Sequence, residues 1–326
     1  MIISRTPLRV SFFGGGSDLP AHYRRRGGAV LSTSIDHFVY VTVSRKFDEA
    51  VRVSYARTEE VAHARQVEHP LVRECLALLG IDGGIEITSV ADIPARGTGL
   101  GSSSSFTVGL LNALHAFRGC HATASRLAEE SCHIEIERCG EPIGKQDQYA
   151  AAFGGFNFIR FHENDSVEVR KVICPQALLE ALQERLLFFY TGVTRSASPL
   201  LQRQAAAVAQ AGKASDATAR MVTLAKAAFD DICDGRIEAL GGMLHEAWEL
   251  KRGLGEGISN ELVDSAYAAA RTAGASGGKL LGAGGGGFLM VYAEPRDHAA
   301  VRKALASLRE VRFRFAPQGS AIIFVH

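Results

Sequence analysis

The sequence lacks the features that mark several common classes of protein. The net charge is only +1 over 326 residues, whereas a nucleic-acid-binding protein usually carries a concentrated basic excess. None of the six cysteines forms a Cys-x-x-Cys pair, which excludes zinc ribbons and thioredoxin-like redox motifs. No apolar run is long enough to span a bilayer, and no secretory signal opens the chain. We therefore expect a reduced, soluble, cytoplasmic protein that binds neither nucleic acid nor a membrane.

Length and composition indicate a folded protein of two domains. Apolar residues make up 47% and charged residues 22%, ordinary values for a globular protein, and the chain is too long for one typical core. Hydrophobic patterns predict mixed α and β structure in both halves, with a domain boundary near residue 183 that gives domains 1–183 and 184–326. The predicted strands cover residues 8–13, 39–44, 51–55, 85–90, 153–161, 186–190, 288–292 and 321–325. The predicted helices lie between residues 101 and 119, over 123–138, and in alanine-rich segments between 198 and 272.

Glycine is the most informative residue type that is present. Its 34 copies include three clusters, at Gly14–Gly16, Gly97–Gly101 and Gly282–Gly287. Glycine weakens helices and strands, so such clusters predict loops in which the backbone bends sharply or approaches another group closely. Loops of this kind carry function more often than the scaffold does.

The middle cluster has the features of a phosphate-binding loop. It stands in the sequence PARGTGLGSSSS at 94–105, directly before a predicted helix. The glycines let several backbone N–H groups converge, and the helix start adds unpaired N–H groups and the positive end of its dipole. The serines add hydroxyl donors and a candidate metal ligand. A serine N-cap after a flexible loop is the alternative, but a cap requires one serine and no glycine cluster.

The loop belongs to neither of two widespread nucleotide-binding motifs. Walker A requires serine or threonine after Gly-Lys, and the Gly-Lys pair at 144–145 is followed by glutamine. The Rossmann spacing Gly-x-Gly-x-x-Gly also fails, because the glycines of 97–101 are spaced by twos. No protein-kinase His-Arg-Asp or Asp-Phe-Gly set is present.

Three motifs, in the same order along the chain, resemble those of the GHMP kinases. The loop at 94–105 is similar to their phosphate loop, PLRVSFFGGGSD at 7–18 to the substrate segment of the sugar kinases, and KLLGAGGGG at 279–287 to their third, glycine-rich motif. The resemblance implies an α+β fold with a ribosomal protein S5 domain 2-like N-terminal domain and a ferredoxin-like C-terminal domain, ATP and sugar meeting in the cleft between them. It implies ATP binding by Gly97, Gly99, Leu100, Gly101, Ser102, Ser103 and Ser104.

A fourth segment, with Glu135, Gly140, Pro142, Gly144, Asp147 and Gln148, matches the galactokinases at each fixed position. The resemblance implies that Asp147 is the base and that Glu135 holds Mg²⁺ with Ser103. Arg9 would lie near Asp147, keep it ionised and orient the reacting oxygen. The chemistry suits these residue types, because a sugar hydroxyl is a weak nucleophile and phosphoryl transfer depends on positioning and charge neutralisation. Taken singly, Glu135 could be a surface carboxylate, with Glu137 serving as well, and Asp147 a helix cap.

Within the family, the start of the chain looks most similar to the D-glycero-D-manno-heptose 7-phosphate kinases. Those enzymes phosphorylate the anomeric oxygen of a phosphorylated heptose, whose product feeds nucleotide-activated heptose for surface polysaccharides. Galactokinases carry Glu-His-Thr-Asp where this chain has GGSD at 15–18, which suggests a different or larger sugar. Asp18 is the first choice for a sugar-hydroxyl contact. The expected substrate-binding residues are Gly15, Gly16, Ser17, Asp18, Lys145, Arg195, Gly284 and Gly285.

A sugar phosphate requires a cationic pocket. Lys145, Arg195 and the run Arg24–Arg26 are the candidates, although the run is more simply a solvated helix face. Two other functions stay open: a kinase of an unphosphorylated sugar such as fucose or galactose, and a sensor that binds ATP and sugar without turnover. The catalytic residues that the resemblance implies, Arg9, Ser103, Glu135 and Asp147, are all present, which argues against the sensor. The sequence does not reveal the oligomeric state, and a homodimer is one alternative.

Overall fold

The computed structural model describes residues 1–94, 97–194, 198–210 and 212–326 and contains two β-sheets flanked by helices. The first sheet has eight strands in the order β12-β1-β2-β5-β3-β4, with β6 paired to β2 and β7 to β6. The second has the order β11-β8-β10-β9. Among the strands of the described residues, β3 and β5 are the one pair that runs in parallel. The strands are β1 Ile2–Phe13, β2 Gly28–Arg45, β3 Val51–Ser54, β4 Thr58–Val61, β5 Ile85–Ala91, β6 Phe156–Phe161, β7 Val167–Lys171, β8 Leu186–Tyr190, β9 Gly277–Leu280, β10 Phe288–Tyr292, β11 Arg309–Glu310 and β12 Ala321–Val325.

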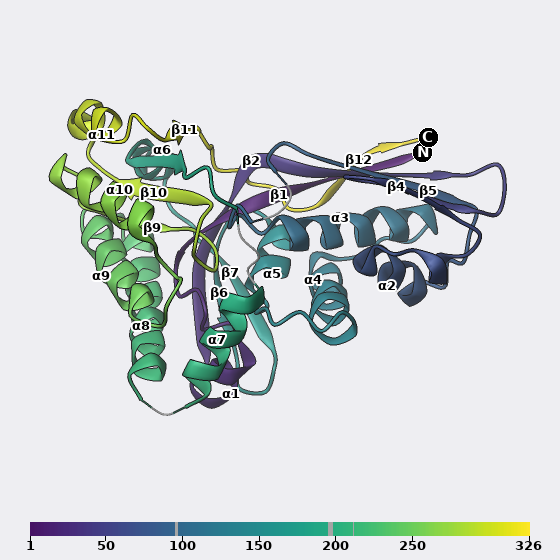
Figure 1. Ribbon diagram of the computed structural model, residues 1–326, viewed down its shortest axis with the longest axis horizontal. Coiled ribbons are helices and arrows are strands. Elements are labelled where there is room, and N and C mark those ends of the chain that lie inside the picture. The colour runs from purple at the N-terminus through teal and green to yellow at the C-terminus, as the bar shows by residue number, and fades with distance from the viewer. Residues whose placement is uncertain (95–96, 195–197, 211) are drawn as a thin grey trace.

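The strand β2 changes partners along its length. Residues 39–45 pair with β5 and residues 28–33 pair with β6, while β1 follows β2 on its other edge with two shifts of register. The first eight residues of β2 are all buried, so they show none of the alternation that reveals a strand with one solvated face. The predicted strand 39–44 is therefore correct but far too short. The long β1–β2 ribbon extends from the N-terminus across the centre of the view to helix α1, Pro20–Arg26 (Figure 1).

Helices cover both sheets. Helix α3 packs on β1 and β2 and is contacted by α2, α4 and α5, whereas α8 packs on β2, β1 and β6 (Figure 1). Among the described residues, no helix is both long and apolar enough to cross a membrane. The helices are α1 Pro20–Arg26, α2 Pro70–Leu78, α3 Ser102–Phe117, α4 Ala124–Cys132, α5 Gln146–Phe153, α6 Gln176–Glu184, α7 Ser198–Ala209, α8 Lys213–Cys233, α9 Leu240–Arg252, α10 Glu261–Thr272 and α11 His298–Ala304, with short turns η1 Ala64–Gln66, η2 His133–Arg138 and η3 Pro295–Asp297.

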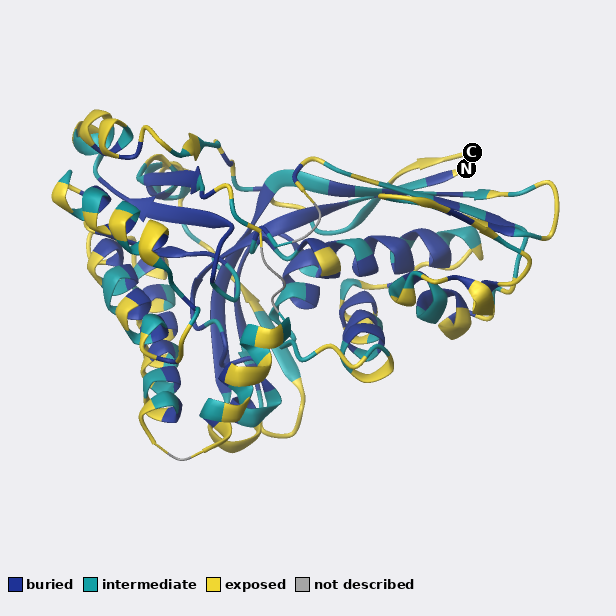
Figure 2. Ribbon diagram, viewed as in Figure 1, coloured by how far each residue is buried: buried dark blue, intermediate teal, exposed yellow. Residues whose placement is uncertain are grey.

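Two apolar clusters form the core. The larger lies between the first sheet and its helices, and the smaller surrounds the fully buried Trp248 beside the second sheet. Buried residues form continuous runs over residues 6–13 of β1 and 28–35 of β2 (Figure 2). Burial of this kind stabilises the fold by about 25 cal/mol for each Å² of apolar surface removed from water.

Two predicted elements differ from the structure. The strand predicted for 153–161 is wrong over its first three residues, because α5 extends to Phe153 and a Gly-Gly pair with positive φ precedes β6. The helix predicted for 123–138 is present, but its last turn, η2, is a π-helix. The boundary near residue 183 stays a prediction. Residues 313–325 return to the first sheet, where Ile35 bridges to Phe315 and β12 pairs with β1.

Candidate active site

The predicted phosphate-binding loop leads into the start of α3, and its glycines have the backbone conformation that the motif requires. Gly97, Gly99 and Gly101 all have φ between 73° and 78°, a region that other residues rarely adopt. The first N–H groups of a helix have no acceptor within the helix, so those of Ser102–Ser104 are free to bind an anion. The Ser102 hydroxyl is buried with no hydrogen-bond partner among the described residues. This cradle of donors fits the phosphates of ATP.

Arg9 joins this loop to Asp147, as expected from the resemblance. The guanidinium of Arg9 donates to both carboxylate oxygens of Asp147 at 2.7 Å, and its third nitrogen donates to the carbonyl of Gly99 at 2.5 Å. Asp147 lies in the first turn of α5, and its side chain is 25% exposed, whereas that of Arg9 is 5% exposed. A Cβ at Gly101 would lie 3.3 Å from the carboxylate. A reachable carboxylate thus stands against the start of α3, held by a paired cation.

Glu135 is buried, so it is not the surface carboxylate that a helical position alone would suggest. It accepts hydrogen bonds from the hydroxyls of Ser103 and Ser104 at 2.9 and 2.7 Å and from the side-chain amide of Gln148 at 2.6 Å. Burial raises the pKa of its carboxyl to about 7, against the opposing effect of these donors. Glu137, by contrast, is exposed and lies 2.8 Å from the ring of His133.

A buried carboxylate and an exposed serine hydroxyl at the phosphate loop fit Mg²⁺. This ion is usually held by one or two carboxylates together with phosphate oxygens. The side chains of Glu135 and Ser103 converge at 2.9 Å at the start of α3, next to the cradle of N–H groups. The donor set therefore suits a metal that is shared with a bound nucleotide.

The loop after β1 forms a polar site around Asp18. This buried carboxylate accepts from the backbone N–H of Gly16 at 3.0 Å and from the backbone and side chain of Gln146 at 3.1 and 3.2 Å. Burial, and then the charge of Asp147, raise the pKa of its carboxyl. A side chain at Gly144 would overlap this carboxylate, which explains the glycine there.

Several polar atoms near this loop are buried without a partner among the described residues. They are the hydroxyl of Ser11, the side-chain carbonyl of Gln146 and the side-chain nitrogen of Gln204. Gln204 lies on α7 and reaches Gly16, while Gln146 and Ser11 lie about 4 Å from the position of a Cβ at Gly15. Buried polar atoms that lack partners are costly, so a polyhydroxylated ligand suits this site.

Ser17, which was predicted to contact the substrate, has a hydroxyl that is hydrogen-bonded within the protein. Its hydroxyl exchanges two hydrogen bonds of 3.1 Å with the backbone of Ala29, which fastens the loop to β2. Gly284 and Gly285 pack against Ile258, and Asn260 donates to the carbonyl of Gly285 at 3.1 Å.

The third glycine loop touches the phosphate loop directly. A side chain at Gly99 would overlap the carbonyl of Leu281, and one at Gly282 would overlap the backbone of Gly99. Lys251, on α9, donates to the carbonyl of Gly282, and Lys279, on β9, donates to that of Phe12 at 3.1 Å. Sequence reasoning assigned no role to either buried lysine or to Gln204. Lys279 is the first residue of a recognised motif, whereas Lys251 and Gln204 lie on helices without one.

Two of the proposed cations for a substrate phosphate, Lys145 and Arg24, meet at Asp165. Lys145 lies 3.0 Å from the carbonyl and 3.5 Å from the carboxylate of Asp165, close to the Asp18 loop. The side chains of Arg24–Arg26 are exposed, and each contacts an acceptor on the surface, which agrees with a solvated helix face. Arg195 lies outside the described residues.

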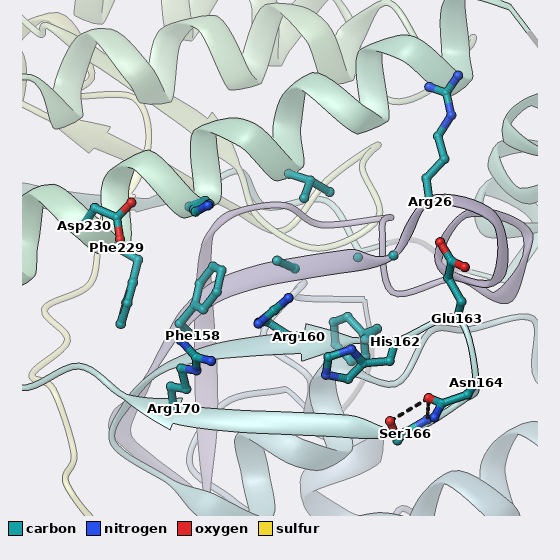
Figure 3. A pocket seen from close by; sticks show the side chains of 16 residues that line it. Arg26, Phe158, Arg160, His162, Glu163, Asn164, Ser166, Arg170, Phe229 and Asp230 are labelled. Atoms are coloured by element: carbon teal, nitrogen blue, oxygen red, sulfur yellow. Dashed lines mark hydrogen bonds between the residues drawn. The ribbon is translucent and has the colours of Figure 1, made fainter.

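A cavity of about 860 Å³ lies between the end of α1, the β6–β7 hairpin and α8. Neither Arg9 nor Asp147 lines it. It includes Arg26, Arg160 and Arg170 (Figure 3). Arg170 donates to Glu168 at 2.6 Å and Arg26 to Asp216 at 2.9 Å, so much of its positive charge is already neutralised. The cavity is therefore separate from the site around Arg9 and Asp147.

Comparisons with known proteins agree with the geometry. The GHMP kinases N terminal domain family matches residues 65–155 and the GHMP kinases C terminal family matches residues 228–311. A D-glycero-alpha-D-manno-heptose 7-phosphate kinase of Campylobacter jejuni is 27% identical over 93% of both chains. A bifunctional fucokinase/GDP-fucose pyrophosphorylase of Arabidopsis thaliana is 26% identical over 90% of this chain and 30% of that protein.

A solved structure shows the same fold. The crystal structure of a D-glycero-D-manno-heptose 1-phosphate kinase from Bacteroides thetaiotaomicron covers all of both chains with a TM-score of 0.82 at 24% identity. The predicted α+β fold of two domains is confirmed, as is the resemblance on which it was based. The chain belongs to the GHMP kinases and is an ATP-dependent sugar kinase.

Proposed function

We propose that this kinase transfers the γ-phosphoryl group of ATP to the anomeric hydroxyl of D-glycero-D-manno-heptose 7-phosphate. The product would be the 1,7-bisphosphate, an intermediate for nucleotide-activated heptose and surface polysaccharide, made in the cytoplasm. The observation that carries the proposal is the Arg9–Asp147 pair, held against the start of α3 beside the buried Asp18. The similarity to the heptose 7-phosphate kinase of Campylobacter jejuni supports this choice of sugar.

The side chains divide the work of the transfer. Bound Mg²⁺ and ATP supply the electrophilic phosphorus and neutralise its charge. The N–H groups of Ser102–Ser104 and the loop glycines would bind the phosphates, and Glu135 with Ser103 would hold the metal. Asp18 orients the sugar through a hydroxyl. Asp147 accepts the proton of the anomeric hydroxyl as that oxygen bonds to the γ-phosphorus, the bond to the β-phosphate oxygen breaks, and ADP leaves.

Arg9 keeps Asp147 ready for that step. Its guanidinium fixes the direction of both carboxylate oxygens of Asp147 through two parallel hydrogen bonds. The contact with the Gly99 carbonyl sets the base at a fixed position relative to the phosphate loop. Positioning of this kind supplies much of the rate enhancement in phosphoryl transfer.

We further propose that Lys145 contacts the 7-phosphate of the sugar. It is only 17% exposed, lies two residues before Asp147, and is held beside Asp165 and over the ring of Tyr23 at 5.0 Å. The contact with Asp165 is long at 3.5 Å, so the ammonium retains the capacity to bind an anion. A fucokinase-like reaction on a free sugar is the second candidate, supported by the Arabidopsis thaliana relative.

The test is ADP release with Mg²⁺ and ATP against mannoheptose 7-phosphate, mannose 6-phosphate, sedoheptulose 7-phosphate, fucose and galactose. We expect turnover of the heptose phosphate, phosphorus NMR that places the new phosphate on C1, and a drop in kcat of about 10²–10⁴-fold in Asp147→Asn. Lys145→Met should raise KM for the sugar phosphate, whereas Lys303→Met on distant α11 should not. Turnover confined to free sugars would refute the heptose assignment, and binding of ATP without turnover of any sugar would favour the sensor.

A further inference from the structure

Lys251 is a buried cation to which neither the fold nor the mechanism above assigns a role. Its side chain rises from the last turn of α9 and is 5% exposed. Among the described residues, its hydrogen-bond acceptor is the carbonyl of Gly282. An ammonium has three donors and is expensive to bury without an opposite charge, so one neutral carbonyl leaves it poorly compensated.

The surroundings of Lys251 place it where the sugar and phosphate sites meet. Gly282, which it contacts, packs against Gly99 of the phosphate loop, and the Gly99 carbonyl accepts from Arg9. The charges of Arg9, of Asp18 in the sugar loop and of the buried Lys279 act on its ammonium electrostatically. Lys251 therefore lies between the loop that binds phosphate and the loop proposed to bind sugar.

The second buried lysine gives an internal contrast. Lys279 is equally buried, but its ammonium donates to the carbonyl of Phe12 and so ties β9 to β1. It contacts neither glycine loop through that ammonium. A bond between two strands is a sufficient structural role, whereas Lys251 contacts a loop that itself borders the phosphate loop.

We propose that Lys251 is a catalytic residue that binds the γ-phosphoryl group of ATP during its transfer. This inference rests on the proposed function. Lys251 would be the cation that the second half of the chain contributes to the γ-phosphoryl group. Glu135, on η2, and Ser103, on α3, lie on one side of the phosphate loop. Lys251 approaches it from the side of the third glycine loop. Charge on the equatorial oxygens of the phosphorus would then be met from two directions.

A comparison of nucleotides tests the contact without any turnover. The wild type, Lys251→Met and Lys251→Arg are titrated with ADP and with the non-hydrolysable ATP analogue AMPPNP, both with Mg²⁺. We expect Lys251→Met to bind AMPPNP about 10- to 100-fold more weakly, as the loss of a charge-assisted hydrogen bond predicts, and to bind ADP within about twofold of the wild type. Lys251→Arg should recover part of the AMPPNP affinity.

The neighbouring Arg252→Met is the matched control, because Arg252 pairs with Glu249 and Asp264 outside the site and should leave both affinities unchanged. Equal weakening of both nucleotides in Lys251→Met would assign the lysine a structural role only, and no weakening of either would also overturn the proposal. Because the readout is nucleotide binding, it stands even if the sugar panel refutes the heptose substrate.

Discussion

Ionisation of Glu135 should make the stability of this protein depend on pH. The carboxyl is fully buried, and burial raises its pKa from 4.5 to about 7. Between these values the folded protein holds a proton that the unfolded chain has already lost. Folding is therefore favoured at low pH and loses stability as pH rises from about 4.5 to about 7, after which the loss is complete.

The expected loss is about 3 kcal/mol, since each pKa unit corresponds to about 1.4 kcal/mol. Glu135→Gln keeps the shape of the side chain and does not titrate. The free energy of unfolding in urea, measured with EDTA at several values between pH 5 and 8, should thus fall in the wild type relative to this variant. Other titrating groups are common to both proteins and cancel in the difference.

Magnesium gives the same experiment a second arm. If Glu135 holds Mg²⁺, then adding the ion with ADP at pH 8 should restore stability to the wild type and much less to Glu135→Gln. A concentration ten times the dissociation constant would contribute about 1.4 kcal/mol. Glu137→Gln is the control, because Glu137 lies two residues further along the chain and is exposed; its stability should depend on pH and on Mg²⁺ as that of the wild type does. A difference between wild type and Glu135→Gln that stays flat from pH 5 to 8 would refute the reasoning.

Three further predictions concern the loops around this carboxylate. Arg9→Lys should lower kcat about 10²-fold or more without unfolding the protein, because an ammonium cannot make the two parallel hydrogen bonds to Asp147. Initial rates and thermal melting measure the two effects, and a near-normal kcat would contradict the prediction. Asp18→Asn should raise KM for the sugar and leave KM for ATP unchanged, and the reverse pattern would remove Asp18 from the sugar site. Gly99→Ala should weaken AMPPNP binding and lower the melting temperature more than Gly80→Ala does. Both glycines have positive φ, but only a Cβ at Gly99 would overlap another loop. Equal effects of the two substitutions would show that the contact between the loops is not needed.

The sequence allowed prediction of the parts whose chemistry is local. The glycines of 97–101 must adopt positive φ, and serines at the start of a helix offer hydroxyls, so the loop is readable from its residues alone. The contact between Arg9 and Asp147 came from family resemblance, and the structure contains it. Spacing could not have supplied it, because 138 residues separate the two side chains.

Other features depend on contacts that no local pattern encodes. Gln204 and Lys251 lie on helices whose alanine and leucine content predicts packing only, and each reaches a loop from a distant part of the chain. Ser17 stands in the right motif, yet its hydroxyl is used by the backbone of Ala29. The buried half of β2 showed no alternation, because both of its faces are covered.

The strand β12 gives the protein a particular order of assembly during synthesis. It covers the outer edge of β1, although these two strands come from opposite ends of the sequence. A ribosome therefore releases β1 long before residues 321–325, and the N-terminal strand waits with one row of N–H and C=O groups unpaired. Nascent chains that stall before residues 321–325 emerge would expose that edge to one another, which makes the interval between the synthesis of β1 and that of β12 the period of greatest risk for aggregation.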